Sequence, residues 1–173
     1  MGTVQVGRMF EDEAEISDYE RGYLEAAIDG EGCLSLAKIP SKTYVNGFRY
    51  TPFIFIAGID RPFIENCKRI ISKVGACSIT HYKNKTSVGN SVYRLAVPPG
   101  TLRLLLPQIS FIIKEQQRLV LLEALKLIEE NMHHHIGNFR TRNFNTLEEL
   151  YLKMRELHPR SFKRLLERKK GRA

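Results

Sequence analysis

Tyr23-Leu24-Glu25-Ala26-Ala27-Ile28-Asp29-Gly30-Glu31-Gly32 is a run of small and apolar residues that ends in two carboxylates, separated and followed by glycine. Its small side chains allow two helices to pack closely. We expect Gly30 and Gly32 to let the chain leave a helix in a conformation that most residues avoid. Glu31 is thereby placed at a helix end, where a carboxylate can hold a divalent cation and the negative end of the helix dipole adds to the attraction.

The charge of the chain is strongly positive and unevenly distributed. Among 173 residues, 27 are Lys or Arg and 19 are Asp or Glu, which gives a net charge of +8. Residues 1–31 contain nine acidic and two basic residues, so the excess of positive charge belongs to the rest of the chain. Such a surplus suits a polyanionic partner. A generally basic, soluble surface fits the charge equally well.

The cysteines and the apolar runs indicate a protein outside membranes. Cys33, Cys67 and Cys77 are widely spaced, odd in number and without a C-x-x-C pair, which is typical of reduced thiols. No apolar run approaches the roughly 20 residues that span a bilayer. We therefore expect a cytoplasmic protein, or one of an organelle matrix if an organelle encodes it, without membrane insertion.

The pattern of apolar residues predicts one domain whose helices alternate with pairs of strands. We expect an N-terminal arm (1–17), a core domain (18–132) and C-terminal helices with a basic tail packed on the same domain (133–173). Ser17 and Glu20 form a capping box for the first helix. The predicted elements are helix 19–29, strands 33–39 and 50–58, a helix after Asp60-Arg61-Pro62, strands 76–82 and 91–97, a short segment 101–106, helix 114–131, a capped helix from Thr146 and a basic helix after Pro159.

The motif at residues 23–32 and this order of elements resemble the LAGLIDADG homing endonucleases. The resemblance covers residues 18–132 and implies an α+β fold with an αββαββα core, in which two hairpins form a curved antiparallel sheet that lies in the DNA major groove. Extra helices follow the core. The motif departs from its namesake at Glu25, where a small residue is usual.

The resemblance also implies the catalytic groups. Glu31 would be the ligand of Mg²⁺ or Mn²⁺, with the Gly30 carbonyl beside it, while Asp29 would be structural and end the helix. A Lys-x-x-Gln step after Pro107 matches Lys114 and Gln117, which places Lys114 near the scissile phosphate. Asp60 is a candidate for orienting water, with a helix N-cap as the alternative reading, and Arg61 is a candidate phosphate contact.

Residues that contact DNA are expected on the outward face of the hairpins, in their loops and in the basic tail. Arg49 and Arg94 suit bidentate contacts to guanine. The run His133-His134-His135 is read as a polar surface turn. The candidates are Ser35, Ala37, Ile39, Arg49, Ser78, Thr80, Tyr82 and Arg94 on strands, Lys42, Tyr44, Asn46, Lys83, Lys85 and Asn90 in loops, Arg61, and Arg160, Ser161 and Lys163 in the tail.

The motif occurs once, whereas a duplex has two strands to cut. The resemblance therefore implies a homodimer on a pseudo-palindromic DNA site, with Tyr23, Ala26, Ala27 and Gly30 at the dimer interface. The expected function is that of an intron- or intein-encoded, metal-dependent, site-specific endonuclease of double-stranded DNA. An RNA maturase that binds its host intron RNA, and a DNA-binding protein that does not cleave, remain as alternatives on the same fold.

Overall fold

The computed structural model describes residues 15–44, 46–83, 91–132 and 143–158. Within these ranges, no helix is long and apolar enough to cross a membrane. Several predicted features lie outside the described residues: the N-terminal arm up to residue 14, Lys85, Asn90, the run His133–His135, and the basic helix after Pro159 with Arg160, Ser161 and Lys163.

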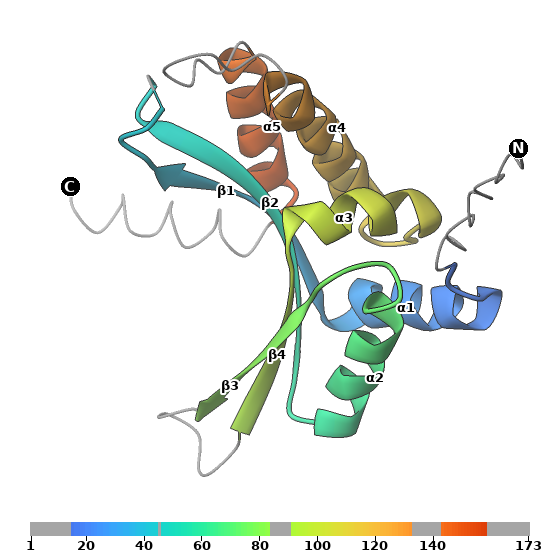
Figure 1. Ribbon diagram of the computed structural model, residues 1–173. Helices are drawn as coiled ribbons and strands as arrows, with labels where there is room; N and C mark the ends of the chain where they lie inside the picture. The colour runs from blue at the N-terminus through green and yellow to red at the C-terminus, as the bar shows by residue number, and fades with distance from the viewer. Residues whose placement is uncertain (1–14, 45, 84–90, 133–142, 159–173) are drawn as a thin grey trace, which may run out of the picture.

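The order of elements confirms the predicted αββαββα core followed by further helices (Figure 1). The elements are α1 (Asp18–Glu31), β1 (Gly32–Pro40), β2 (Phe48–Gly58), α2 (Arg61–Ile71), β3 (Ser78–Lys83), β4 (Ser91–Val97), α3 (Pro99–Leu105), the 3₁₀ turn η1 (Leu106–Gln108), α4 (Glu115–Met132) and α5 (Phe144–Glu156).

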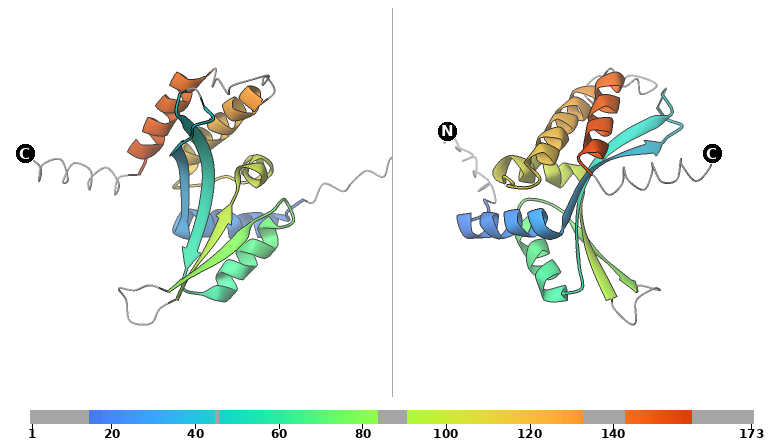
Figure 2. Two further views of the ribbon diagram at one scale, coloured as in Figure 1. Left: turned by 60° about the vertical axis from the view of Figure 1, so that its left-hand side comes forward. Right: turned by 180° about the vertical axis from the view of Figure 1, so that it is seen from behind.

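The four strands form one antiparallel sheet in the order β1-β2-β4-β3. The two hairpins meet along the end of β2, where Ile54 pairs with Val97 and Gly58 with Tyr93. Pro52 pairs with Leu36 on β1 and precedes the part of β2 that β4 joins, so its missing N–H costs no ladder bond on that side. The hairpins bend away from the helices, which leaves a curved sheet with one face that no described helix covers, here called the open face (Figures 1 and 2).

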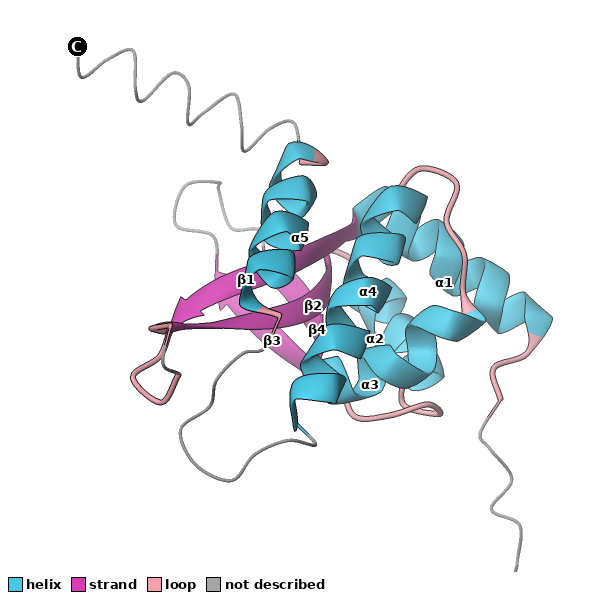
Figure 3. Cartoon of the chain, turned by 90° about the horizontal axis from the view of Figure 1, so that it is seen from above, coloured by secondary structure: helices cyan, strands magenta, loops and turns pink. Residues whose placement is uncertain are grey.

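Helices α1 to α4 cover the other face of the sheet, and α5 lies across β1 beside α4 (Figures 2 and 3). Alternation along the strands supplies the core, because every second side chain of a strand points to the same side. Leu34, Leu36, Ile54, Ile56 and Leu95 are fully or almost fully buried under the helices. The residues between them in sequence therefore point to the open face.

One helix start differs from the prediction, and one predicted cap makes no side-chain hydrogen bond. The helix predicted from Thr146 begins two residues earlier, at Phe144, and Asn143 at its N-cap position makes no side-chain cap hydrogen bond. Packing accounts for the earlier start, since the Phe144 ring lies 5.8 Å from that of Tyr50 on β2. Asp60 stands at the N-cap position of α2, also without a side-chain cap hydrogen bond.

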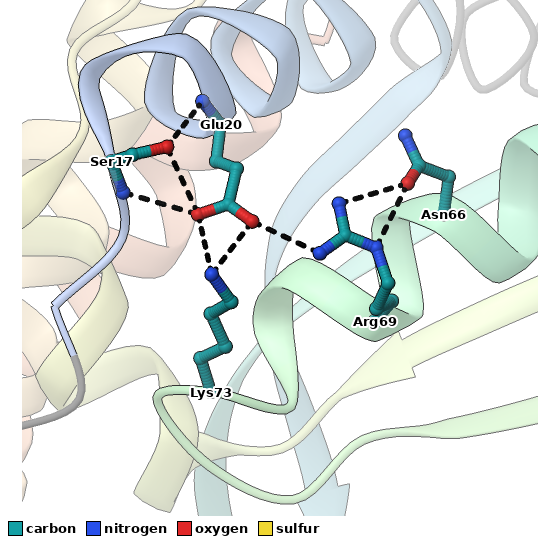
Figure 4. A network of polar contacts seen from close by, with 5 residues as sticks. All are labelled: Ser17, Glu20, Asn66, Arg69 and Lys73. Carbon is teal, nitrogen blue, oxygen red and sulfur yellow. Dashed lines mark hydrogen bonds and ion pairs between the residues drawn. The ribbon is translucent and has the colours of Figure 1, made fainter.

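The capping box of α1 is present and belongs to a larger network that joins α1 to α2 (Figure 4). The Glu20 backbone N–H donates to Ser17 Oγ at 3.3 Å, and the Ser17 N–H donates to the Glu20 carboxylate at 3.1 Å. That carboxylate, 8% exposed, also binds Lys73 Nζ at 2.7 Å and Arg69 Nη1 at 3.0 Å. The bond to Lys73, then that from Ser17, lowers the Glu20 pKa from 4.5 to about 2.

The Glu20 network predicts a specific loss of stability in acid. Because the Glu20 pKa is lower in the folded chain than in the unfolded chain, its contribution is complete above pH 4.5 and disappears as the pH falls towards 2. Thermal melts between pH 7 and pH 2 measure this. The Glu20→Gln variant should melt at a lower temperature than the wild type at pH 7, and the gap should close in acid. A constant gap over that range would contradict the role of the carboxylate.

Candidate active site

Glycine has a different role in the motif from the one predicted. Neither Gly30 nor Gly32 adopts a positive φ, and Gly47 is the one described glycine that does. The helix continues through Gly30 to Glu31, and Gly32 follows at φ −79° in extended backbone. A Cβ on Gly32 would lie 2.5 Å from the Ile28 carbonyl oxygen. Gly32 is therefore required for close approach of the strand to the helix, not for an unusual backbone conformation.

Glu31 is the last residue of α1 and is exposed. Within the described part of the chain its carboxylate makes no hydrogen bond or ion pair, unlike Glu20, Glu25 and Asp29 on the same helix. No group of three or more His, Cys, Asp or Glu that could hold a metal ion occurs among the described residues. One carboxylate with the neighbouring Gly30 carbonyl fits Mg²⁺, which takes few protein ligands and keeps its remaining positions for water and phosphate oxygens.

Asp29 binds the start of α4. Its carboxylate accepts the backbone N–H groups of Ile112 at 2.7 Å, Ile113 at 3.2 Å and Lys114 at 3.0 Å. Amide groups at a helix N-terminus lack partners within the helix, and a carboxylate there also meets the positive end of the helix dipole. Asp29 thus acts as a cap supplied from another helix. It does not end α1, which continues for two more residues.

Glu25 has a related role that the sequence did not reveal. Its carboxylate accepts the Ser110 N–H at 2.7 Å and the Ser110 hydroxyl at 3.2 Å. Glu25 and Asp29 lie one helical turn apart, so both face the segment that leads into α4. Phe111-Ile112-Ile113 offers no side chain that can cap α4, which is a signal for a cap from elsewhere in the chain, but no residue near Glu25 identifies Ser110 as its partner.

Lys114 makes the reverse contact, from the start of α4 to the end of α1. Its ammonium donates to the carbonyl oxygens of Ile28 at 2.6 Å and Asp29 at 2.5 Å, which belong to the last turn of α1. Burial lowers the Lys114 pKa, while the negative charges of Asp29, Cys33 and Glu31 act in the other direction. Two of the three ammonium hydrogens are used, so one donor remains beside the end of α1 that carries Glu31. We call these contacts of Glu25, Asp29 and Lys114 between α1 and residues 110–114 the α1–α4 clamp.

The other predicted catalytic residues lie apart from Glu31. Gln117 is buried and its amide donates to the Leu157 carbonyl at 3.0 Å, at the end of α5. Asp60 is exposed after β2, and its carbonyl accepts the Ile64 N–H at 3.3 Å, while its side chain makes no hydrogen bond within the described ranges. Arg61 donates to Glu65 at 2.7 Å within α2. No contact in the described part of the chain joins these three to Glu31, and their catalytic roles remain predictions.

The predicted base-reading residues share the open face of the sheet. Ser35, Ala37 and Ile39 alternate with the buried Leu34 and Leu36 on β1. The strand register places Arg49 opposite Ile39 and Thr80 opposite Arg94, so the members of each pair lie on the same face. Lys42 and Asn46 are exposed in the β1–β2 loop, with Tyr44 half-buried between them, and the side chain of Lys83 lies outside the described part. The face is thus built as predicted, and each base contact remains a prediction.

Aromatic rings on this face were missed by sequence reasoning. Phe53 and Phe55 alternate with the buried Ile54 and point to the open face, with ring centroids 4.5 Å apart. The Arg94 guanidinium lies 4.6 Å from the Phe55 ring centroid and 5.4 Å from that of Tyr82. Stacking on two rings restricts the long side chain without using its N–H donors.

The surface around α1 carries unusually exposed apolar residues. Ile112 is 96% exposed, Ile113 77% and Tyr19 80%. Gly22 and Gly30 have open space where a side chain would stand. Ala26 is exposed, whereas Ala27, predicted at a dimer interface, is 7% exposed and faces the core of its own chain. The exposed face of α1 is therefore Tyr19, Gly22, Ala26 and Gly30.

Comparison with known proteins identifies the fold. No protein-family model and no curated protein matches this chain. The archaeal intron-encoded homing endonuclease I-Vdi141I in complex with DNA is similar with a TM-score of 0.62 and 20% identity, over 81% of this chain and 84% of the other. I-CvuI in complex with its target in the presence of 2 mM Ca is similar with a TM-score of 0.56 and 14% identity, over 82% and 85%. The LAGLIDADG homing endonuclease I-SmaMI bound to cleaved DNA is similar with a TM-score of 0.51 and 19% identity, over 64% and 37%.

The chain thus has the fold of the LAGLIDADG homing endonucleases, as the motif and the order of elements predicted. The clamp and Glu31 lie at the end of α1 that leads directly into β1.

The α1–α4 clamp predicts graded losses of stability. Asp29→Ala removes the acceptor of three backbone N–H groups and should lower the free energy of unfolding by about 1–2 kcal/mol, as loss of a helix N-cap does. Asp29→Asn keeps one acceptor oxygen and should cost less. Urea titrations of both variants measure the order. Equal stability of Asp29→Ala and the wild type would show that the cap contributes nothing.

Proposed function

We propose that this protein is a metal-dependent, site-specific endonuclease of double-stranded DNA. The observation that carries the proposal is that an exposed Glu31 carboxylate without a partner among the described residues and the Lys114 ammonium lie at the same end of α1. Directly after Glu31, the chain enters β1, whose Cys33 is exposed and alternates with the buried Leu34 and Leu36, so it belongs to the open face. The Glu31 carboxylate therefore lies two residues from the first residue of the open face.

Mg²⁺ or Mn²⁺ would be held by the Glu31 carboxylate and the Gly30 carbonyl. Such an ion supplies a water of lowered pKa and neutralises charge on the phosphate. The donor set fits because Glu31 is exposed and free of hydrogen bonds and ion pairs within the described ranges.

Lys114 would stabilise the negative charge that grows on the phosphate as water attacks. Its ammonium is held by two carbonyl groups and retains one donor, so little reorientation is needed when a phosphate oxygen arrives. The clamp fixes this position through Asp29, whose carboxylate binds the Lys114 backbone while its carbonyl binds the Lys114 side chain.

A homodimer would supply the second active site that a duplex requires. The exposed face of α1 carries the small residues Gly22, Ala26 and Gly30 beyond Tyr19, and Ile112 and Ile113 are exposed beside it, which suits close packing with a second copy about a two-fold axis. That arrangement brings two Glu31 residues together and implies a pseudo-palindromic DNA site. Lys42 and the outward arginines would meet the phosphates and bases of each half-site.

Cleavage of a randomised target library in magnesium, followed by sequencing of the cut ends, tests the proposal and yields the target. Glu31→Gln should lose at least about a hundredfold in single-turnover rate, the scale expected when one key stabilising group is removed, and should still bind the target. Glu149→Gln, on an exposed face of α5, is the matched control and should cut normally.

Wild-type cutting by Glu31→Gln would overturn the catalytic assignment. Specific binding without cutting by the wild type would leave a DNA-binding protein, and binding of a structured intron RNA in place of DNA would leave a maturase.

The proposed dimer interface predicts the effect of a single charge. Ile112→Lys should convert the dimer into a monomer at micromolar concentration, because an unpaired ammonium would be buried at the interface. Sedimentation velocity measures the change. Leu152→Lys places the same charge at an exposed apolar residue of α5 and should leave the dimer intact. A wild-type monomer that still cuts both strands would contradict the interface.

A further inference from the structure

The open face of the sheet contains a hollow of about 410 Å³ that the sequence did not predict. Its walls are mostly apolar. We call it the concave-face hollow, and its lining includes Phe53, Phe55, Cys77, Ser78, Ala96 and Pro98.

The position of the hollow follows from strand register. Ser78 lies opposite Ala96, and Ala96 opposite Phe55, so these three side chains stand in a row across β3, β4 and β2. The strand pairing of β4 ends at Val97 opposite Ile54, and the chain then turns away at Pro98. Phe53 therefore has no β4 neighbour beside it. Because β4 ends there, the space beside Phe53 is left for the hollow.

Arg94 lies next to the hollow on the same face. It is two residues before Ala96 on β4, and its guanidinium stacks on Phe55, which lines the hollow. A position fixed by two aromatic rings leaves the planar fork of donors available for the O6 and N7 atoms of guanine. The hollow and Arg94 thus present an apolar site and a fixed cation side by side.

DNA offers one group that fits the apolar site. In the major groove, base edges present hydrogen-bonding groups and a single apolar substituent, the C5-methyl group of thymine. Residues two apart on a strand are about 6.7 Å apart, which is roughly two base-pair steps of about 3.4 Å. A face that binds guanine through Arg94 therefore brings a neighbouring base edge to the hollow.

We propose that the concave-face hollow receives thymine C5-methyl groups next to a guanine bound by Arg94, and so determines part of the sequence specificity. The proposal rests on the proposed binding of DNA to the open face. The volume of the hollow exceeds that of one methyl group, so it accommodates the methyl edges of adjacent thymines.

The test removes single methyl groups from the DNA. The wild-type protein is titrated, in the absence of divalent metal, with the target found by library cleavage and with copies in which one thymine at a time is replaced by uracil. At one or two positions in each half-site, uracil should weaken binding about fourfold, equivalent to about 0.8 kcal/mol for a buried methyl group. At those positions 5-methylcytosine should bind more tightly than cytosine by a similar factor.

A matched pair of variants locates the effect. Ala96→Leu fills the hollow and should abolish the difference between thymine and uracil, whereas Thr51→Leu places a leucine on the same face, outside the hollow and at no predicted DNA contact, and should preserve it. Thermal melts check that both variants fold.

The outcomes separate this inference from the proposed function. If the thymine target is bound and cut but no position distinguishes thymine from uracil, the inference is wrong and the endonuclease stands. If Thr51→Leu and Ala96→Leu alter discrimination equally, the hollow is not the site. If the thymine target itself is not bound specifically, both the proposed function and this inference fail. The absence of specific binding to unmodified DNA identifies that case.

Discussion

The α1–α4 clamp is the interaction on which the arrangement of the site depends. Asp29 joins the end of one helix to the beginning of another twice, through its carboxylate to the amides of residues 112–114 and through its carbonyl to the Lys114 ammonium. Negative charge stands at a helix N-terminus and positive charge at a helix C-terminus, so both dipoles favour the same geometry. Glu25 extends this contact by one turn. Because Glu31 follows Asp29 by two residues, the carboxylate and the ammonium cannot move independently.

A second constraint comes from the two faces of the sheet. One face is filled by aliphatic residues under α1, α2 and α4. The other consists of alternate residues that lie outside the buried core. Under the proposed function, stability and recognition would therefore be carried largely by different residues of the same strands. The Glu20 network contributes to stability, since it joins α1 to α2 at the end of α1 that is remote from Glu31.

The sequence was sufficient for features that depend on local chemistry. The capping box at Ser17, the alternation along the hairpins and the placement of Glu31 at the end of a helix all follow from residues close together in the chain. Features that depend on residues far apart were missed or misread. Glu25 looked like a departure from a pattern, because its partner Ser110 is 85 residues away. The start of α5 was placed at Thr146, since nothing nearby shows that Phe144 packs on Tyr50.

Gly32 has a mechanical consequence beyond its fit against Ile28. It is the first residue of β1, so it acts as the pivot of a nine-residue lever arm. At about 3.3 Å per residue that arm is roughly 30 Å long, and a tilt of about 5° at the pivot would displace its far end by about 2.6 Å. Such a displacement approaches one base-pair step of about 3.4 Å. In the proposed complex with DNA, the absence of a side chain at Gly32 would therefore help to set which base the tip of the hairpin meets.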